Sequence, residues 1–457
     1  MNSKLMFFLM TLELFTAKMN WAQNTKHSSW GLSKQITNKR NIADSMVPNV
    51  FGSSVFQNLT QNDNKFDVIF AELYFYQEAF VVLGHIFKAP IVVFSSNNYF
   101  AFDILRYSGA LNSAAYLPDK RLGYAGSLNL FQRLQNTWAH YAIMLYNEYF
   151  YYPEHDTLLL QYIPGPLPTI SEMLGTVSIS FLTANIALDG AKIYPPNIIE
   201  ISGMHLKEAK PLDEGLQSIM DNSKFGVIFI SFGTMLKMSQ FKTEDINIFL
   251  SVFKELNQTV LWKSDFNSEM NSKIPKNVYV RDWFDQVSIL AHPNCALFVT
   301  HGGVSSIMEA VKYSVPVVGM PFFADQFSNI ANAVYRGYGI QLLRNNLTEL
   351  SLGWALKTAL EDPRFKESIS KASKVFTDRP MSSLDSAIYW TEYVIRHNGA
   401  HHLKPLTVQM PWYQVFMLDV IAIYLFGCFI FLFLIIKIIS LSLRSFFFKS
   451  NTLKGKK

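Results

Sequence analysis

The feature that most constrains this chain is a short apolar run that ends in a glycine turn and continues into an amphipathic segment. Ala296–Thr300 is apolar, which is typical of a buried parallel strand. His301-Gly302-Gly303 follows, and its glycines let the backbone approach a ligand closely. Ile307–Tyr313 has apolar residues at helical spacing, so the pattern predicts a strand, a turn and a helix. The free N–H groups at such a helix start favour an anion, and a diphosphate suits them.

Polar side chains around this junction suit a ligand that carries phosphates and hydroxyls. The imidazole of the turn and the hydroxyls of Ser305 and Ser306 add hydrogen-bond donors. Glu309 lies about one turn into the helix, where an acid can accept hydrogen bonds from ribose. A second buried strand leads to Asp325 and Gln326 on another strand-to-helix loop, where open α/β sheets place ligand contacts. An acid beside an amide suits sugar hydroxyls.

Trp283 follows its own predicted strand, Asn277–Arg281, and its indole face is suited to stacking on a base. The order Trp, Gln, His-x-Gly, Glu, Pro and Asp-Gln along Trp283–Gln326 resembles the signature of family 1 UDP-glycosyltransferases, the detoxifying UDP-glucosyl and UDP-glucuronosyl transferases. The similarity extends over roughly residues 50–440 and includes a helix near 379–402 that, in the family, crosses back onto the first domain.

The resemblance implies a role for each matching position. The tryptophan stacks on uracil, the following glutamine contacts uridine, the turn and its serines hold the diphosphate, the glutamate holds ribose, and Asp-Gln holds the donor sugar. The implied donor-site residues are Trp283, Gln286, His301, Gly303, Ser305, Ser306, Glu309, Asp325 and Gln326. One position departs from the family pattern, because Asp285 stands where a proline is usual before the glutamine, which puts the rigidity of this loop in question.

A second glycine turn precedes the signature. Gly226–Phe232 is predicted as a strand, and the family's corresponding turn faces the diphosphate, which makes Ser231, Gly233 and Thr234 candidate contacts. An ordinary glycine turn is the alternative. The helix that follows is predicted to begin at Thr243 as its cap.

The implied fold is α/β, with two Rossmann-like domains facing across a cleft, of the GT-B type, and one C-terminal transmembrane helix. The predicted boundaries are 1–206 for an acceptor-binding domain incomplete at its start, 207–405 for the UDP-sugar domain, 414–443 for the membrane helix and 444–457 for a basic cytosolic tail. In the first domain, Phe66–Leu73, Ala79–Phe87 and Pro90–Phe94 read as a β–α–β unit. Residues 95–155 are aromatic-rich and either line a pocket for an apolar acceptor or belong to the core.

The stretch Val420–Ile436 carries no charge and extends to about 20 apolar residues with its flanks, enough to cross a bilayer. Positive residues follow it, so the tail is expected in the cytosol and the globular part in the lumen. Sequons at Asn58, Asn257 and Asn346 agree, although each is weak alone. The resemblance further implies that the membrane is that of the endoplasmic reticulum.

The composition argues against a nucleic-acid-binding protein, a disulfide-rich protein and a zinc protein. The net charge of +5 is partly in the last residues and is no nucleic-acid footprint. The two cysteines, Cys295 and Cys428, are not expected to pair, and neither has the spacing of a zinc site. No metal and no cofactor are expected. The expected partners are the UDP-sugar donor, a small lipophilic acceptor, the membrane and related transferases in a homo- or hetero-oligomer.

The catalytic base that the resemblance implies is not found in this sequence. Transfer to a hydroxyl needs a base, and the family uses a histidine after its first strand, oriented by an acid that falls at Glu72. The family's opening with this histidine is not found. His27 has no strand before it, and His85 lies inside a predicted helix, where a structural role is favoured. We therefore expect a truncated isoform, gene model or pseudogene product that lacks the first β–α unit.

Two further interpretations stay open. The chain is either an active transferase or a catalytically silent homologue that binds UDP-sugar or pairs with active relatives, and a transporter ranks far below because it needs more spans. At the N-terminus, Leu5–Phe15 is apolar and reads either as a weak signal peptide, against which Glu13 argues, or as a buried helix of the first domain.

Overall fold

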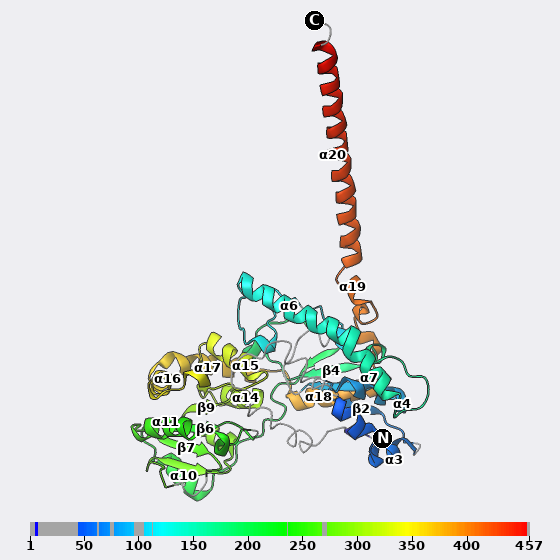
Figure 1. The fold of residues 1–457 in the computed structure, drawn as a ribbon. Helices are drawn as coiled ribbons and strands as arrows, with labels where there is room; N and C mark the ends of the chain where they lie inside the picture. The colour runs from blue at the N-terminus through cyan, green and yellow to red at the C-terminus, as the bar shows by residue number, and fades with distance from the viewer. Residues whose placement is uncertain are drawn as a thin grey trace. The chain divides into compact units, whose positions relative to one another are not determined.

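The computed structural model describes residues 5–7, 44–61, 64–73, 77–95, 105–111, 113–234, 236–266 and 272–454 of the 457-residue chain. The chain divides into two compact units, Met1–Lys404 and Pro405–Lys457. The first unit contains two parallel β-sheets, sheet A and sheet B, each packed with its own helices (Figure 1).

Within the described residues, sheet A has five strands in the order β1-β2-β3-β4-β5, all parallel. They are β1 (Leu5–Phe7), β2 (Val68–Ala71), β3 (Ile91–Ser95), β4 (Ile179–Leu182) and β5 (Ile198–Glu200). Side chains that alternate along the strands pack on opposite faces, as period 2 requires. Ile69 and Ile91 belong to the core that most of the sheet A helices cover, whereas Val68 and Val92 face the other side.

That other face of sheet A is covered by a helix from the far end of the unit. Helix α18 (Ser383–Arg396) packs its Ala387 and Val394 against Val92 and Phe181 of the sheet. The crossing back that the resemblance implies for this helix is therefore present, and it ties the end of the unit to its beginning.

The other helical elements on the sheet A side follow in chain order. A helix covers residues 44–51, and then come α3 (Ser54–Gln61), the 3₁₀ turn η2 (Glu78–Val81), α4 (Val82–Phe87), α5 (Leu105–Ser108), the 3₁₀ turn η4 (Lys120–Leu122), α6 (Leu130–Tyr146), the π-helical η5 (Asn147–Tyr151), α7 (Tyr152–Leu159), α8 (Ile170–Leu174) and α9 (Ile186–Asp189).

The described part of the chain forms six parallel strands in sheet B, in the order β11-β10-β9-β6-β7-β8. They are β6 (Val227–Ser231), β7 (Thr259–Lys263), β8 (Val278–Arg281), β9 (Cys295–Thr300), β10 (Val317–Gly319) and β11 (Gly339–Gln341). The chain builds outward from β6 to β8 on one side and then from β9 to β11 on the other. This is the doubly wound order of a dinucleotide-binding sheet, with its switch point between β6 and β9.

Both faces of sheet B are buried, which explains why its strands read as continuous apolar runs. Val227 and Phe229 point into one core, and Ile228 and Ile230 point into the other. The helices around the sheet are α10 (Glu214–Asp221), the 3₁₀ turn η6 (Met238–Gln240), α11 (Thr243–Lys254), α13 (Gln286–Ala291), α14 (Val304–Lys312), α15 (Gln326–Tyr335), the 3₁₀ turn η7 (Arg344–Asn346), α16 (Glu349–Glu361) and α17 (Pro363–Thr377).

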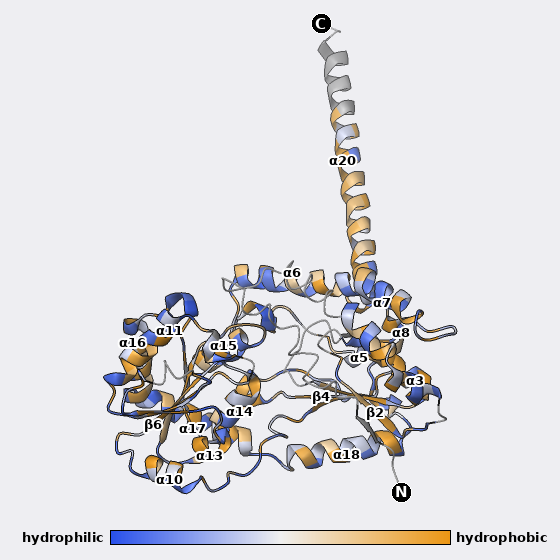
Figure 2. Cartoon of the chain, turned by 60° about the horizontal axis from the view of Figure 1, so that its bottom comes forward, coloured by the Kyte–Doolittle hydropathy of each residue, from blue (hydrophilic) through white to orange (hydrophobic). Residues whose placement is uncertain are grey.

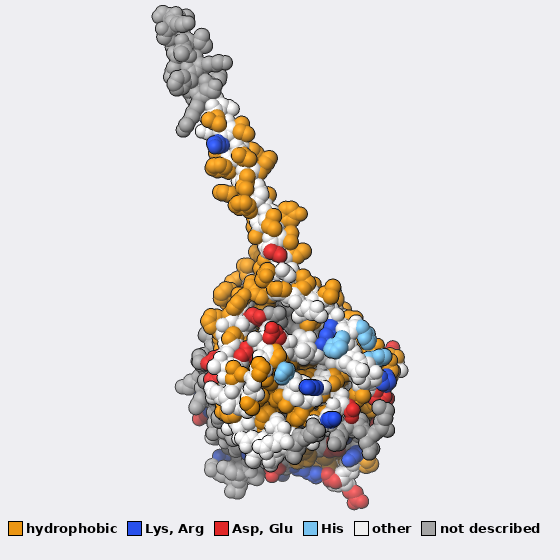
Figure 3. All heavy atoms as spheres, turned by 90° about the vertical axis from the view of Figure 1, so that its right-hand side faces the viewer, with side chains coloured by type: hydrophobic (Ala, Val, Ile, Leu, Met, Phe, Trp, Pro, Cys, Tyr) orange, Lys and Arg blue, Asp and Glu red, His pale blue; other side chains and the backbone are white. Residues whose placement is uncertain are grey.

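The 3₁₀ turn η8 (His401–Leu403) closes the first unit, and the second unit contains the 3₁₀ turn η9 (Leu406–Val408), α19 (Trp412–Val415) and the long helix α20 (Leu418–Lys454). Leu418–Leu443 has a mean hydropathy of 2.7 and is long and apolar enough to cross a membrane. Most of α20 is orange in the hydropathy colouring of Figure 2, and hydrophobic side chains cover much of its visible surface in Figure 3.

Several local expectations need correction. Leu5–Phe7 form a strand that pairs in parallel with β2, so the helical interpretation does not hold for these residues. Thr243 is the first residue of α11, and Lys242 is its cap, without a side-chain cap bond. Helix α20 begins at Leu418 and runs on to Lys454, so it includes most of the predicted tail. Cys295 and Cys428 are both free, as expected.

Candidate active site

The carboxyl ends of β6 and β9 lie side by side at the switch point of sheet B. Ser231, the last residue of β6, is opposite Thr300, the last residue of β9. In parallel α/β sheets the loops that leave these two ends in opposite directions open a crevice for a ligand. The two glycine turns that the sequence singled out therefore meet at one place.

The imidazole of His301 lies between two glycines. A Cβ on Gly233 would lie 2.9 Å from His301 Cε1, and a Cβ on Gly303 would lie 2.7 Å from its Nε2. Contacts below 3.0 Å are too close for a real Cβ, so any side chain at either position would require the imidazole to shift. Gly233 and Gly302 also have positive φ values, +80° and +86°, which glycine adopts without strain.

His301 is neutral at physiological pH. Burial and the nearby ammonium of Lys263 lower the pKa of His301 to about 4. The ring therefore offers one N–H donor and one acceptor rather than a charge. Positive charge for an anion at this turn comes instead from Lys263 and from the N-terminal end of α14.

Lys263, which the sequence prediction did not include, connects three parts of the site. It ends β7 at the same edge of the sheet, donates from Nζ to the carbonyl oxygen of Gly233 over 3.2 Å, and lies 4.2 Å from the ring centroid of Trp283. Its position at the carboxyl end of the short apolar run Thr259–Lys263 is the signal that could have identified it.

Trp283 presents its ring to solvent, with 67% of its surface exposed. The loop that carries it is held at its other end by Asp285, which caps α13 by accepting a hydrogen bond from the backbone N–H of Ser288 over 3.3 Å. Asp285 also accepts a hydrogen bond from the Ser288 hydroxyl over 3.0 Å. The aspartate thus constrains this loop by capping, where the family has a proline.

Gln286, Ser306 and Glu309 form one hydrogen-bonded group. The amide nitrogen of Gln286 donates to Glu309 Oε2 over 2.5 Å and to the Ser306 hydroxyl over 3.2 Å. Burial and then repulsion from Asp285 raise the pKa of Glu309, against the hydrogen bond from Gln286. A carboxylate of raised basicity accepts hydrogen bonds more strongly, which suits ribose hydroxyls.

Asn329 on α15 connects the glycine turn to the Asp-Gln loop. Its amide nitrogen donates to the carbonyl oxygen of Gly302 over 3.0 Å and to Asp325 Oδ2 over 2.6 Å. Burial raises the pKa of Asp325, while Asn329 and then Lys120 act against that shift. Gln326 accepts hydrogen bonds at Oε1 from the backbone N–H groups of two loop residues, Phe322 and Phe323, over 2.9 and 3.1 Å.

The structure thus gathers most predicted donor-site residues at the carboxyl edge of sheet B or on the helices that start there. Thr234 and Ser305 are exposed at this edge. Glu72 stands apart, half-buried directly after β2 at the carboxyl edge of sheet A. His85 is exposed on α4, as a structural helix residue would be, and His27 lies outside the described residues.

The aromatic residues proposed for an acceptor pocket divide into two groups. Tyr107, Tyr151 and Tyr152 are buried in the core of sheet A, whereas Trp138 and Phe150 are 70% and 65% exposed. Those around residue 100 lie outside the described residues. The first group therefore belongs to the hydrophobic core.

Comparison with known proteins places this geometry in a family. The family model described as "UDP-glucoronosyl and UDP-glucosyl transferase" matches residues 10–453. UDP-glucosyltransferase 2 of Dactylopius coccus is 36% identical over 371 residues, which are 81% of this chain and 71% of that protein. UDP-glucuronosyltransferase 2B14 of Oryctolagus cuniculus is 32% identical over 78% of this chain and 66% of that protein.

Solved structures share the fold at low identity. The glycotransferase of kitacinnamycin superposes with a TM-score of 0.54 at 16% identity, over 80% of this chain and 83% of that one. UDP-glucose: anthocyanidin 3-O-glucosyltransferase in complex with UDP gives a TM-score of 0.51 at 16% identity, over 82% and 84%. The two parallel sheets thus form a GT-B fold, and the chain belongs to the UDP-glucuronosyl and UDP-glucosyl transferase family.

Proposed function

We propose that this protein transfers glucose, or glucuronate, from its UDP-sugar to a hydroxyl of a small lipophilic acceptor. The observation that carries the proposal is the meeting of the two glycine turns around His301 at the switch point of sheet B, with Trp283 and the Asp325–Gln326 pair at the same edge. The nucleobase of a UDP-sugar needs an aromatic face, its diphosphate needs an anion site, and its hexose needs a pair of polar groups.

The proposed reaction is a single in-line displacement without metal, which inverts the anomeric carbon. The acceptor oxygen forms a bond to that carbon as the bond to the UDP oxygen breaks, and the acceptor proton passes to a base. The charge of the leaving diphosphate would be met by the Lys263 ammonium, the N-terminal N–H groups of α14 and the hydroxyls of Ser305 and Ser306.

We propose that Glu72 serves on the acceptor side. It follows β2 at the carboxyl edge of sheet A, the edge at which parallel sheets place their ligand contacts. In the family an acid at this position orients the histidine base. Replacing it should lower the rate of transfer without changing the affinity for UDP, because UDP would be held by sheet B alone.

We also propose that α20 anchors the protein in the endoplasmic reticulum membrane, with the globular unit in the lumen. The length and hydropathy of Leu418–Leu443 support a span. Asn58, Asn257 and Asn346 of the three sequons are all exposed, which glycosylation requires. A mobility shift on glycosidase treatment of the protein from cells would support this orientation, and the absence of any shift would argue against it.

The test of the proposed function separates binding from transfer. The full chain in detergent is titrated with UDP by calorimetry and then assayed with UDP-glucose and a phenol, next to Glu72→Gln. We expect UDP to bind both proteins equally and the variant to transfer more slowly. Binding without transfer in the unaltered chain would favour a silent homologue, and no binding of UDP would refute the proposal.

A further inference from the structure

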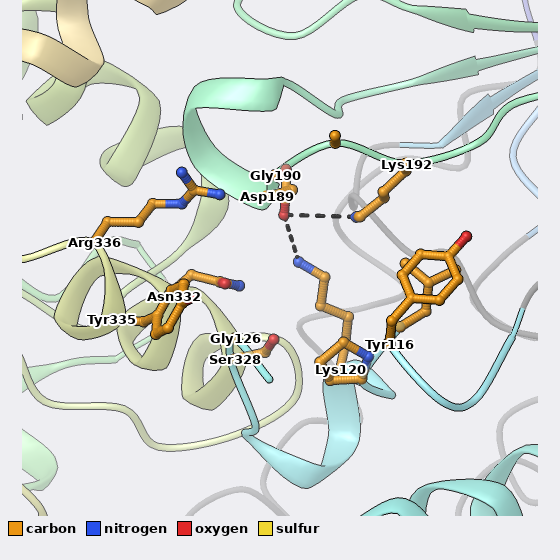
Figure 4. Close-up of a pocket in the computed structure, with 13 residues that line it drawn as sticks. Tyr116, Lys120, Gly126, Asp189, Gly190, Lys192, Ser328, Asn332, Tyr335 and Arg336 are labelled. Carbon is orange, nitrogen blue, oxygen red and sulfur yellow. Dashed lines mark hydrogen bonds and ion pairs between the residues drawn. The ribbon is translucent and has the colours of Figure 1, made fainter. Parts of the chain in front are cut away.

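A cavity of about 160 Å³ lies beside the Asp-Gln loop and is lined from both sheets' helices and loops. Figure 4 shows Lys120 and Lys192 reaching toward Asp189, with Asn332 of α15 and Arg336, which directly follows α15, on the opposite side. A dry cavity of about 150 Å³ encloses one benzene molecule, so this space holds a carboxylate with the few atoms attached to it.

The side chains that line this cavity carry more positive than negative charge. Lys120 and Lys192 share one oxygen of Asp189, at 2.9 and 3.9 Å, and all three side chains are at most 8% exposed. Arg336 donates from Nε to the carbonyl oxygen of Leu188 over 2.9 Å, a neutral partner. Among the described residues that line the cavity, three cations therefore accompany one carboxylate.

The described charges near the lining leave a smaller excess, because Glu200 and Asp325 add two carboxylates and Arg379 adds a fourth cation. Glu200 attracts Lys192 from outside the cavity, but Glu200 is itself attracted by Arg379. Burial, with smaller contributions from Lys120 and Arg336, lowers the pKa of Lys192 to about 8 despite the attraction of Asp189. A buried cluster of this kind is stabilised when an anion enters it, because opposite charge offsets the desolvation of the cations.

The cavity is adjacent to the part of the site that would hold the sugar. Ser328 and Asn332 line it from α15, one and two turns after Asp325. Lys120 lowers the pKa of Asp325 as well as pairing with Asp189, so it lies within electrostatic reach of both carboxylates. A substrate held by Asp325 therefore has its polar atoms near these cations.

We propose that this cavity is a subsite for a substrate carboxylate, either the uronate group of the donor sugar or a carboxylate on the acceptor. The proposal rests on the proposed function, since it takes the substrate to lie between Asp325 and sheet A. Lys192 and Arg336 would pair with the carboxylate, and Asn332 and Ser328 would donate to it as neutral groups.

The experiment measures six dissociation constants for each protein, with the full chain in detergent. The donor pair is UDP-glucuronate and UDP-glucose. The acceptor pair is 6-hydroxy-2-naphthoic acid and its methyl ester, each titrated with and without saturating UDP. The variants are Lys192→Gln, which removes one cation, and Asn332→Asp, which adds a negative charge from the other wall with almost no change of shape. Lys357→Gln on the exposed face of α16 is the matched control.

We expect both cavity variants to weaken the binding of one carboxylate ligand by roughly tenfold or more and to leave its neutral partner within about twofold. A change confined to UDP-glucuronate assigns the carboxylate to the donor, and one confined to the naphthoic acid assigns it to the acceptor. If the variants changed the dissociation constants of charged and neutral ligands equally, or if neither variant changed any of them, the proposal of a carboxylate subsite would be wrong. Loss of UDP binding by the unaltered chain would instead refute the proposed function, while the acid titrated without UDP still tests the cavity.

Discussion

The strand-to-helix junctions of the two sheets differ in how far apart their contacting residues lie in the chain. At the carboxyl edge of sheet B, Gln286 contacts Glu309, Asn329 contacts Gly302 and Lys263 contacts Gly233, pairs 23, 27 and 30 positions apart. At sheet A, the start of η2 is held by Glu78, which accepts from the hydroxyl of Tyr151, 73 positions away. Short separations make the junctions of sheet B visible as one contiguous pattern, whereas long separations hide how the junctions of sheet A are assembled.

Gly303→Val is the variant for which we expect the largest effect on UDP binding at sheet B. The new side chain would collide with His301, whose Nε2 lies 2.7 Å from the position of the Cβ, and would displace the turn. Overpacking of this kind costs up to about 3 kcal/mol, so we expect UDP affinity to fall by roughly a hundredfold in calorimetry. Gly353→Val is the control, since a Cβ there meets nothing within 4 Å. Unchanged affinity in Gly303→Val would mean that UDP does not bind at this turn.

A smaller loss is expected for Trp283→Ala. Removal of an aromatic platform under a base costs about 1–3 kcal/mol, so UDP should bind roughly thirtyfold more weakly. Trp354→Ala is matched to it, because Trp354 is also exposed, at 60%, but lies on α16 away from the edge. If both variants weakened binding alike, the effect would not come from stacking.

Asp325→Asn should affect the sugar rather than the nucleotide. The amide keeps the shape of the carboxylate but accepts hydrogen bonds more weakly, so we expect the affinity for UDP-glucose to fall by about tenfold while that for UDP holds. The comparison variant is Asp378→Asn at the exposed end of α17. Parallel losses for UDP and UDP-glucose would place the aspartate at the phosphates instead.

The smallest effect concerns acid stability. His301 has a pKa of about 4 in the folded chain and an ordinary value near 6.5 when unfolded, so the unfolded state binds the extra proton between these values. Its contribution to the free energy of unfolding is intact above pH 6.5 and is lost progressively as the pH falls toward 4. His301→Asn should flatten this part of the pH profile in thermal melts. A profile identical to that of the unaltered chain would mean that the ring is not buried as described.

Much of sheet B was predictable because each strand is a short apolar run that ends in a turn. Strand β8 has all but the first residue of the predicted Asn277–Arg281, and β9 begins one residue early at Cys295. The three-residue strand β11 was missed because Gly339–Gln341 is too short to show a period. Strand β1 was missed because Leu5–Phe7 is equally short and lies within a longer apolar stretch.

The side chains of the site were predictable where a motif names them and not where geometry alone places them. Lys263 was missed because it belongs to no motif, and its place at the carboxyl end of a strand was the only signal in the sequence. The role of Asp285 was visible only once α13 was seen to begin at Gln286. Lys120 and Asp189, 69 positions apart, could not be paired from the chain at all, because their contact depends on how loops from distant parts of sheet A meet.

The hydrogen bonds of Gln326 have a consequence for analogue design. Its carbonyl oxygen is occupied by the two N–H groups of Phe322 and Phe323, so the amide has only its NH₂ group to offer a ligand. A sugar position that faces this group is recognised by its lone pairs and not by its proton. Replacing the hydroxyl there by fluorine should therefore preserve more binding than replacing it by hydrogen, which makes fluorinated nucleotide sugars suitable probes for this enzyme.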